Sequence, residues 1–462
     1  MKSFKPIVTV FMAIAFSVVM VSFCGCSQEE QQQQSETNTA SHVTDRSGQK
    51  IEASSITTSK DYSSSNSNEH ALTADATSAN YSNVKVSKTG GSSGDNADFC
   101  GQNAAMLASN GGSFSLNDIV VDTDGSYATG VFAYGENSAI NISHSVINTN
   151  SRNSGGVMVT GGATLTATDV TAITSGDSSA PIRSDRGGGN LTVNGGYYKA
   201  CGNGSPSIYS TANIVANGAY LESTTAEGVV VEGKNSVTLN DCQLIAANTK
   251  QNSSNSNVFK GIMIYQSMSG DAASGTSSFS ATDGSITNAN GDVFYITNTA
   301  CNINLKNVSI TNNDSSGNFL RAESAGWGNS GSNGGNANVF ANKQTIDGNM
   351  IVDSSSTVNL YLADNSTFSG AINSSEQAGD VYVDIKEGST WTLSADSHVS
   401  SLNCADGCIN LNGHTLYVDG KAYSSGSSTG SAFDITSSSS SSGGMGGGAG
   451  GSTPPEKPKG EN

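Results

Sequence analysis

Apolar and polar positions alternate with a period of two along short segments of this chain, and Gly- and Asn-rich turns separate the segments. One phrase, a small residue followed by alternating apolar positions, reads G-V-F-A-Y at Gly130, G-V-M-V-T at Gly156 and G-I-M-I-Y at Gly261. Its copies recur every 21 to 33 residues, and their first inward apolar residues are Val131, Val157, Ile182, Ile208, Val229, Ile262, Phe294 and Leu320. Self-similarity at such a period is typical of a solenoid, in which each unit buries its apolar face by stacking on its neighbours.

The residue types indicate strands rather than helices within each unit. The units are rich in Val, Ile, Thr, Ser and Asn and lack a 3.6-residue period. One unit divides into three strands, Val131–Tyr134, Ala139–Ser143 and Val146–Thr149, with turns between them. Three short strands per turn predict an all-β fold, a parallel β-helix of roughly a dozen coils at about 4.8 Å per rung.

The two ends of the chain differ from this pattern. Lys2 and Lys5 precede an apolar run over residues 7–23, as in an export signal. We therefore expect a signal peptide over 1–25, a flexible Ser/Gln/Asn-rich tether over 26–80, the β-helix over 81–423 and a low-complexity Ser/Gly/Pro tail over 424–462. Both tails are expected to be disordered. The alternative for the first segment is an uncleaved membrane anchor, because 17 apolar residues reach the lower limit of about 17 for a span.

Two resemblances add to this interpretation. The sequence Cys24-Gly25-Cys26-Ser27 resembles the lipobox of bacterial lipoproteins, which would make Cys26 the lipidated residue. The patterns S-T-W-T-L at 389–393 and I-N-L-N-G-H-T-L-Y at 409–417 resemble the C-terminal part of adhesin-like bacterial surface proteins, and the earlier units are similar to the pectate-lyase-like superfamily. The resemblance covers about residues 97–423. It implies a right-handed β-helix and an extracytoplasmic, surface-exposed, lipid-anchored protein, but it specifies architecture more than activity.

Composition limits the class of partner. The formal net charge of −18 repels nucleic acid and anionic lipid. Neutral glycans, cationic groups or Ca²⁺ remain as partners, and we expect contact with the membrane only through the N-terminal lipid. No cofactor is expected, although the acidic surface leaves Ca²⁺ open as a ligand.

Motifs for chemistry are incomplete. We expect no buried strand before the G-x-S-x-G match at residues 90–94 and no helix after it, so we interpret it as a chance match in a loop. The five histidines form no H-E-x-x-H pair. Cys404 and Cys408 flank a turn short enough for a local disulfide, with a zinc site as the less favoured alternative. We expect the other four cysteines of the body to be buried small hydrophobic residues: Cys100, Cys201, Cys242 and Cys301.

The outward positions of the first strand form the candidate site. Solvated strand positions are normally small and polar, yet two columns here carry aromatic, methionine and charged residues. Aromatic rings that stack on sugars, with charged groups that bond hydroxyls, suit a carbohydrate groove. The candidate ligand-binding residues of this ribbon are Phe132, Tyr134, Arg183, Asp185, Tyr209, Glu232, Tyr265, Tyr295, Arg321 and Glu323. The alternative is that a long loop, 250–260 or 324–338, folds over these residues and makes them a second core.

These observations favour a lipid-anchored surface β-helix that binds a glycan, extracellular matrix or a host surface, without catalysis. The alternative is a polysaccharide lyase or glycoside hydrolase acting on a plant or mucosal glycan, because Asp185 and Glu232 are predicted to lie two rungs apart, about 9.6 Å. A passive structural spacer comes third. The residue types of the ribbon distinguish these three functions, because an enzyme would concentrate acidic residues there and a spacer would not place aromatic residues there.

Overall fold

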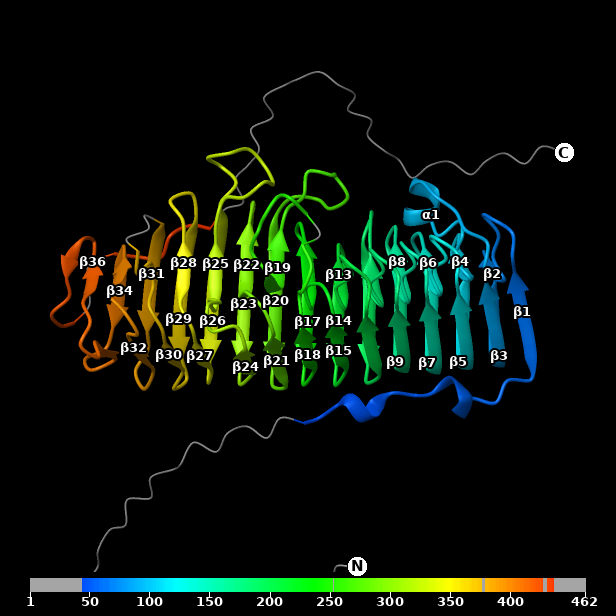
Figure 1. The fold of residues 1–462 in the computed structure, drawn as a ribbon, viewed down its shortest axis with the longest axis horizontal. Helices are drawn as coiled ribbons and strands as arrows, with labels where there is room; N and C mark the ends of the chain where they lie inside the picture. The colour runs from blue at the N-terminus through cyan, green and yellow to red at the C-terminus, as the bar shows by residue number, and fades with distance from the viewer. Residues whose placement is uncertain (1–43, 252, 376–378, 427–429, 436–462) are drawn as a thin grey trace, which may run out of the picture. The chain divides into compact units, whose positions relative to one another are not determined.

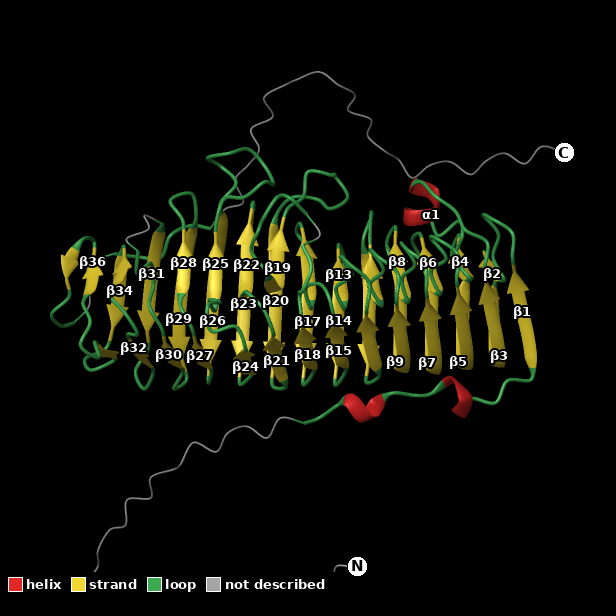
Figure 2. Cartoon of the chain, in the orientation of Figure 1, coloured by secondary structure: helices red, strands yellow, loops and turns green. Residues whose placement is uncertain are grey.

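Strands make up almost all of the regular structure. The computed structural model describes residues 44–251, 253–375, 379–426 and 430–435. Within these ranges the only helices are two 3₁₀ turns, η1 (Ser47–Gln49) and η2 (Ala53–Ser55), and one short helix, α1 (Asp95–Phe99). A strand ends at Lys88 and α1 begins directly after residues 90–94, so the expectation of neither a strand before nor a helix after the G-x-S-x-G match is wrong. None of them is long or apolar enough to cross a membrane. The chain winds into a parallel β-helix, which confirms the predicted fold (Figures 1 and 2).

One leg of most coils lies in an eleven-stranded parallel sheet. Its strands, in spatial order, are β2 (Leu72–Asp75), β4 (Met106–Ser109), β6 (Val131–Tyr134), β8 (Val157–Thr160), β10 (Ile182–Ser184), β13 (Ile208–Ser210), β16 (Val229–Glu232), β19 (Lys260–Tyr265), β22 (Asp292–Thr297), β25 (Leu320–Ala322) and β28 (Met350–Val352). Each strand pairs in parallel with the strand one coil on.

In most coils the other two legs lie in a nineteen-stranded sheet, whereas the last coils have only one leg in it. It begins with the short β1 (Lys60–Ser64), and in the next coils both legs are merged into single long strands: β3 (Ser78–Lys88), β5 (Ser113–Thr123), β7 (Ala139–Thr149) and β9 (Ala163–Thr174). In the middle coils they are pairs: β11 (Gly189–Asn194) and β12 (Tyr197–Ala200), β14 (Asn213–Asn217) and β15 (Tyr220–Ser223), β17 (Ser236–Asn240) and β18 (Gln243–Ala246), β20 (Thr276–Thr282) and β21 (Ser285–Asn288), β23 (Thr299–Lys306) and β24 (Ser309–Asn312). The last members are β26 (Gly335–Asn342), β29 (Thr357–Ala363), β31 (Asp380–Ile385) and β34 (Ser401–Cys404).

Two small sheets complete the C-terminal coils. A four-stranded sheet contains β27 (Thr345–Asp347), β30 (Thr367–Ser369), β32 (Thr390–Thr392) and β35 (Ile409–Asn410). A three-stranded sheet contains β33 (Ser397–Val399), β36 (Leu416–Val418) and β37 (Lys421–Ala422). The β36–β37 pair is antiparallel, so it ends the run of parallel rungs close to the predicted end of the β-helix at residue 423.

The predicted three strands per unit are merged in the first coils. The predicted strands Ala139–Ser143 and Val146–Thr149 are one strand, β7, which bends at His144. The backbone of His144 has φ 43°, in the left-handed region. One left-handed residue turns the chain through a corner without a loop, so strand pairing continues on both sides of the bend.

The β-helix begins earlier than predicted, and the boundary at residue 80 is wrong. β1 and β2 both lie inside the segment expected to be a tether. Leu72 and Ala74 are buried in the core, while Thr73 and Asp75 between and after them are exposed. The first coil needs few apolar residues of its own because the next coil supplies the remaining contacts, and so its composition looks like that of a linker.

Residues 44–59, also expected to be tether, form a strap on the outside of the nineteen-stranded sheet (Figure 1). At one end of the strap the Arg46 backbone N–H donates to Gln243 Oε1 at 2.7 Å. At the other end Ile56 is buried against Val120 and Val146. The residues before 44, which include Cys26 and the predicted signal peptide, and those after 435 lie outside the described ranges.

Candidate functional site

The inward column of the eleven-stranded sheet has the predicted register. Val131 pairs with Val157, Val157 with Ile182, and Ile182 with Ile208. The column continues through Val229, Ile262, Phe294 and Leu320. All eight side chains are fully buried. The recurring phrase therefore marks the core of each coil, as the sequence predicted.

The outward columns also have the predicted register. Arg183 pairs with Met158 on one side and Tyr209 on the other, and Tyr295 pairs with Met263 and Arg321. In the neighbouring column Glu232 pairs with Tyr265. The ribbon therefore exists as a continuous set of side chains on the outer face of the sheet.

The ribbon is not an open groove, so the expectation of an exposed aromatic face is wrong. At its N-terminal end the segment 90–104, which contains α1, covers Phe132 and Met158, and both are fully buried. Gly101 lies directly on the Phe132 ring, because a Cβ at Gly101 would come within 2.9 Å of Phe132 Cγ. The Thr160 hydroxyl donates to the carbonyl oxygen of Phe99 at 2.6 Å and fixes the same segment. Burial, together with a hydrogen bond to Cys100, raises the pKa of Tyr134 to about 12.

Two more loops cover the central part of the ribbon. Val230, Met263 and Tyr295 form a second buried cluster, against which Val258 and Trp327 pack from the loops 247–259 and 323–334. The Tyr265 and Trp327 rings meet edge to face at 5.5 Å between centroids. The alternative weighed from the sequence, a covered ribbon with a second core, is the arrangement observed. A sugar has no access to the ring of Phe132 or Tyr295.

Arg183 and Asp185 form a buried ion-pair cluster beneath α1. One guanidinium nitrogen of Arg183, Nη2, lies 2.8 Å from Asp98 Oδ1 and 2.9 Å from Asp185 Oδ2. Burial raises the pKa of Asp185 to about 6, and the attraction of Arg183 offsets only part of that rise. The cluster therefore ties the α1 segment to the sheet rather than presenting charge to a ligand.

Arg186, at the next turn, connects two surface segments. Its guanidinium donates to Asp271 Oδ1 from Nη2 at 2.7 Å and contacts Asp95 Oδ2 at 3.2 Å. It also stacks on the Phe99 ring, 4.0 Å from the ring centroid. One arginine therefore holds both the α1 segment and the loop that carries Asp271.

Glu232 is almost completely buried and accepts three hydroxyl hydrogen bonds. Tyr209 and Tyr265 donate to Oε2 at 2.5 and 3.0 Å, and Ser267 donates to Oε1. Burial raises the pKa of Tyr209 and Tyr265 well above 10. Asp185 and Glu232 were predicted to lie two rungs apart, and they do, because Asp185 directly follows β10, Glu232 ends β16 and β13 pairs with both strands. Both residues are at most 4% exposed and each carboxylate is bonded to its own neighbours, so neither faces an open cleft.

A third polar cluster lies beneath the loop 323–334. Arg321 Nε donates to the buried carboxylate of Asp292 at 2.6 Å, and the Tyr295 hydroxyl donates to Glu323 at 2.7 Å. The Lys260 ammonium lies 4.4 Å from the Tyr295 ring centroid, and burial lowers the pKa of Lys260. Arg321 and Asp292 are therefore paired across neighbouring rungs, and the Lys260 ammonium donates to the carbonyl oxygen of Val258 at 2.9 Å, so each buried charge has a polar partner.

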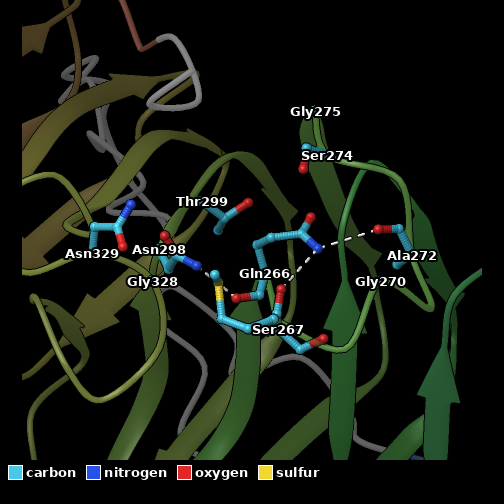
Figure 3. Close-up of a pocket in the computed structure, with 11 residues that line it drawn as sticks. Gln266, Ser267, Gly270, Ala272, Ser274, Gly275, Asn298, Thr299, Gly328 and Asn329 are labelled. Atoms are coloured by element: carbon cyan, nitrogen blue, oxygen red, sulfur yellow. Dashed lines mark hydrogen bonds between the residues drawn. The ribbon is translucent and has the colours of Figure 1, made fainter. Parts of the chain in front are cut away.

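A pocket opens beside these clusters, between the loop 266–275 and the loop 323–334. Figure 3 shows Gln266 and Ser267 at its centre, with Asn329 on one side and Ala272 and Ser274 on the other. The cavity volume is about 230 Å³, and its walls combine hydroxyl, amide and backbone groups with the apolar side chains of Met268 and Ala272. Ser267 belongs to both the pocket and the Glu232 cluster. No lining residue was predicted from the sequence, because the two loops carry no periodic pattern that would bring them together.

Metal and thiol chemistry receive no structural support within the described ranges. No group of three or more His, Cys, Asp and Glu side chains there is placed to hold a metal ion. Cys404 and Cys408 are both buried, and no disulfide joins them in this structure. The Cys404 thiol donates instead to the carbonyl oxygen of Gly426 at 3.4 Å. Cys242 and Cys301 are buried as predicted, whereas Cys100 and Cys201 are only partly buried.

Comparisons with known proteins identify no relative. No protein-family model matches the chain, and no curated protein or solved structure matches it.

Proposed function

We propose that this chain is a lipid-anchored, extracytoplasmic β-helix on the surface of a bacterial cell that binds a glycan without chemistry of its own. The observation that carries this proposal is the loop-bearing outer face of the eleven-stranded sheet. Long connections converge there on a rigid stack of rungs, and two of them form the polar pocket. Binding residues in proteins lie disproportionately on loops that a rigid scaffold positions.

The cover over the ribbon changes where the ligand contacts the protein. The buried rings and ion pairs of the ribbon support the loops from below, and the loops themselves present amide and hydroxyl groups to solvent. Groups of that kind both donate and accept hydrogen bonds, which is the pattern that sugar hydroxyls require. A formal charge of −18 further favours a neutral polymer over an anionic one.

The test of binding is retention of the full-length protein, in detergent, on immobilised plant, mucosal and matrix polysaccharides. Retention that a soluble form of the same polymer competes away is the expected result. The same incubations are analysed for new reducing ends and unsaturated products. Product release would replace the proposal with the lyase or hydrolase alternative, and no retention on any polymer would favour a structural spacer.

The anchor is tested separately, because Cys26 lies outside the described residues. Cys26→Ala should abolish incorporation of labelled palmitate and leave the protein unprocessed or released from membranes, and Cys24→Ala is the matched control. Continued labelling of Cys26→Ala would refute the lipid anchor without affecting the argument for binding.

A further inference from the structure

We propose that the pocket between the loops 266–275 and 323–334 is a subsite for one uncharged sugar residue. This inference rests on the proposed glycan binding and names its site and the chemical class of its ligand. The pocket is distinct from the ribbon that the sequence pointed to, because most of its lining residues come from the loops above that ribbon. Asn298 and Thr299, from the corner between β22 and β23, complete the lining, and neither is one of the predicted ribbon residues.

The lining selects a neutral ligand. None of the residues that line the pocket carries a charged side chain. The nearest acids are already engaged, because Glu232 accepts hydrogen bonds from Ser267 and two tyrosines, and Asp271 binds Arg186. A carboxylate or ammonium group on a ligand would lose its hydration without gaining a counter-charge, and that loss is unfavourable. Hydroxyl and acetamido groups would find matching partners in the lining.

The size of the pocket selects a single residue. Its volume of about 230 Å³ is below the roughly 300–1,000 Å³ typical of sites that enclose drug-sized ligands. One sugar ring fits this space better than an enclosed oligosaccharide does. A polymer would therefore engage the pocket through a chain end or a branch residue.

The loop 266–275 is held in place before any ligand arrives. The Gln266 side-chain amide donates to the carbonyl oxygens of Ser267 and Ala272, each at 3.2 Å, and Asn298 Nδ2 donates to the Gln266 carbonyl oxygen at 2.8 Å (Figure 3). The backbone N–H of Asp271 donates to Ser269 Oγ, and the Asp271 carboxylate binds Arg186. A preorganised loop lowers the entropy cost of binding.

An apolar side chain stands at the rim of the pocket. Met268 is 69% exposed, and it is the one strongly exposed large hydrophobic residue in the part of the chain that the structure describes. An exposed methionine beside polar walls offers the C–H face of a sugar an adaptable apolar contact. The pocket therefore combines the polar and apolar contacts that distinguish a sugar from a small polar ion.

The experiment is saturation-transfer difference NMR and titration on the full-length protein. The probes are neutral sugars (glucose, galactose, mannose, fucose and the two N-acetylhexosamines), with glucuronate, N-acetylneuraminate and glucosamine as charged comparisons. At least one neutral sugar should bind, with a Kd of the order of 1 mM, about −4 kcal/mol. Ser274→Trp should fill the pocket and weaken that binding at least about tenfold. Ser330→Trp adds the same bulk at an exposed position that is not part of the lining, and it should leave the Kd unchanged.

Met268→Ala provides a second variant with little risk to folding, because the side chain is mostly exposed, and a threefold to tenfold loss is expected. Charged sugars that bind as tightly as neutral ones would overturn the inference. The inference would also be overturned if Ser274→Trp bound the sugar as tightly as the wild type and unfolded at the same temperature. Polymer retention unchanged in Ser274→Trp would overturn the pocket assignment and leave the proposed function standing. If the wild-type protein were not retained on any polymer, the proposed function itself would be refuted.

Discussion

Burial and ion pairing shift the pKa of the Asp185 carboxyl group in opposite directions. The side chain is 6% exposed and contacts Arg183, but Arg183 is shared with Asp98. A single guanidinium cannot fully compensate two carboxylates removed from water, so the pKa of Asp185 rises to about 6. The folded state consequently binds a proton at Asp185 more tightly than the unfolded chain, in which the pKa is about 3.8.

This raised pKa predicts how stability changes with pH. The stabilisation from protonated Asp185 is complete below about pH 4 and is lost as pH rises through about 6. Asp185→Asn keeps the neutral form at every pH, so its free energy of unfolding relative to wild type should rise by about 1–3 kcal/mol between pH 4 and pH 8. Urea unfolding at both pH values measures this difference. Asp61→Asn, at an exposed position, should show no such trend, and a flat profile for Asp185→Asn would contradict the assignment.

The bends of the long strands show how an element can turn without a loop. Corner residues in successive rungs have positive φ values: Asn83 at 56°, Asp118 at 53°, His144 at 43° and Asp169 at 50°. The next corner is a glycine, Gly195, at 63°. Asn, Asp and Gly tolerate the left-handed region best, and β-branched residues tolerate it least. The alternation of polar corners with apolar strands in the sequence therefore has a backbone cause.

A substitution at one corner tests this cause. Asp169→Val should lower the free energy of unfolding by about 1–2 kcal/mol, because a β-branched side chain is forced into the left-handed region. Asp169→Gly should be neutral or stabilising by up to about 1 kcal/mol. Thr164→Val, an exposed position of the same strand without a positive φ, is the control and should have little effect. Equal stability of the two valine variants would show that the corner carries no conformational constraint.

On the scale of the whole body, the strap 44–59 connects coils that the solenoid otherwise joins only through nearest neighbours. Ile51 N–H donates to Thr171 Oγ1 at 2.7 Å, between the ends fixed at Gln243 and at Val120. The outward column beneath the strap includes the stacked pair Tyr197 and Tyr220, 4.6 Å between ring centroids. A segment that crosses several rungs couples their stability, whereas isolated rungs would fray one at a time.

Weakening the contacts at one end of the strap should therefore destabilise several coils. Ile56→Asn removes a buried apolar side chain from the cluster with Val120 and Val146 and should lower the free energy of unfolding by about 1–3 kcal/mol. Amide hydrogen exchange should become faster in β5, β7 and β9 together. Ser54→Asn, on an exposed position of the strap, should change neither measurement. Faster exchange confined to residues 44–59 would mean that the strap does not couple the coils.

The sequence by itself determined the coil and its register. Side chains alternate across a strand with period two, and each strand pairs with the same phrase one unit later, so local pattern is enough to assign inward Val131 and outward Phe132. Composition was a weaker guide at the N-terminal end, where it predicted a tether for residues that form β1, β2 and the strap. Too few apolar residues there signalled disorder, although neighbouring coils and an outer sheet face supply the missing contacts.

Only the tertiary structure decided what lies on the ribbon and where a ligand has access. Phe132 is covered by the segment around Gly101, and Tyr295 by loops that contribute Val258 and Trp327. These contacts join residues that are not related by the sequence repeat. The course of the long loops depends on the three-dimensional structure and not on the alternating pattern of the strands. The pocket beside Ser267 has the same origin, because most of its walls come from two loops that meet only once the rungs beneath them are stacked.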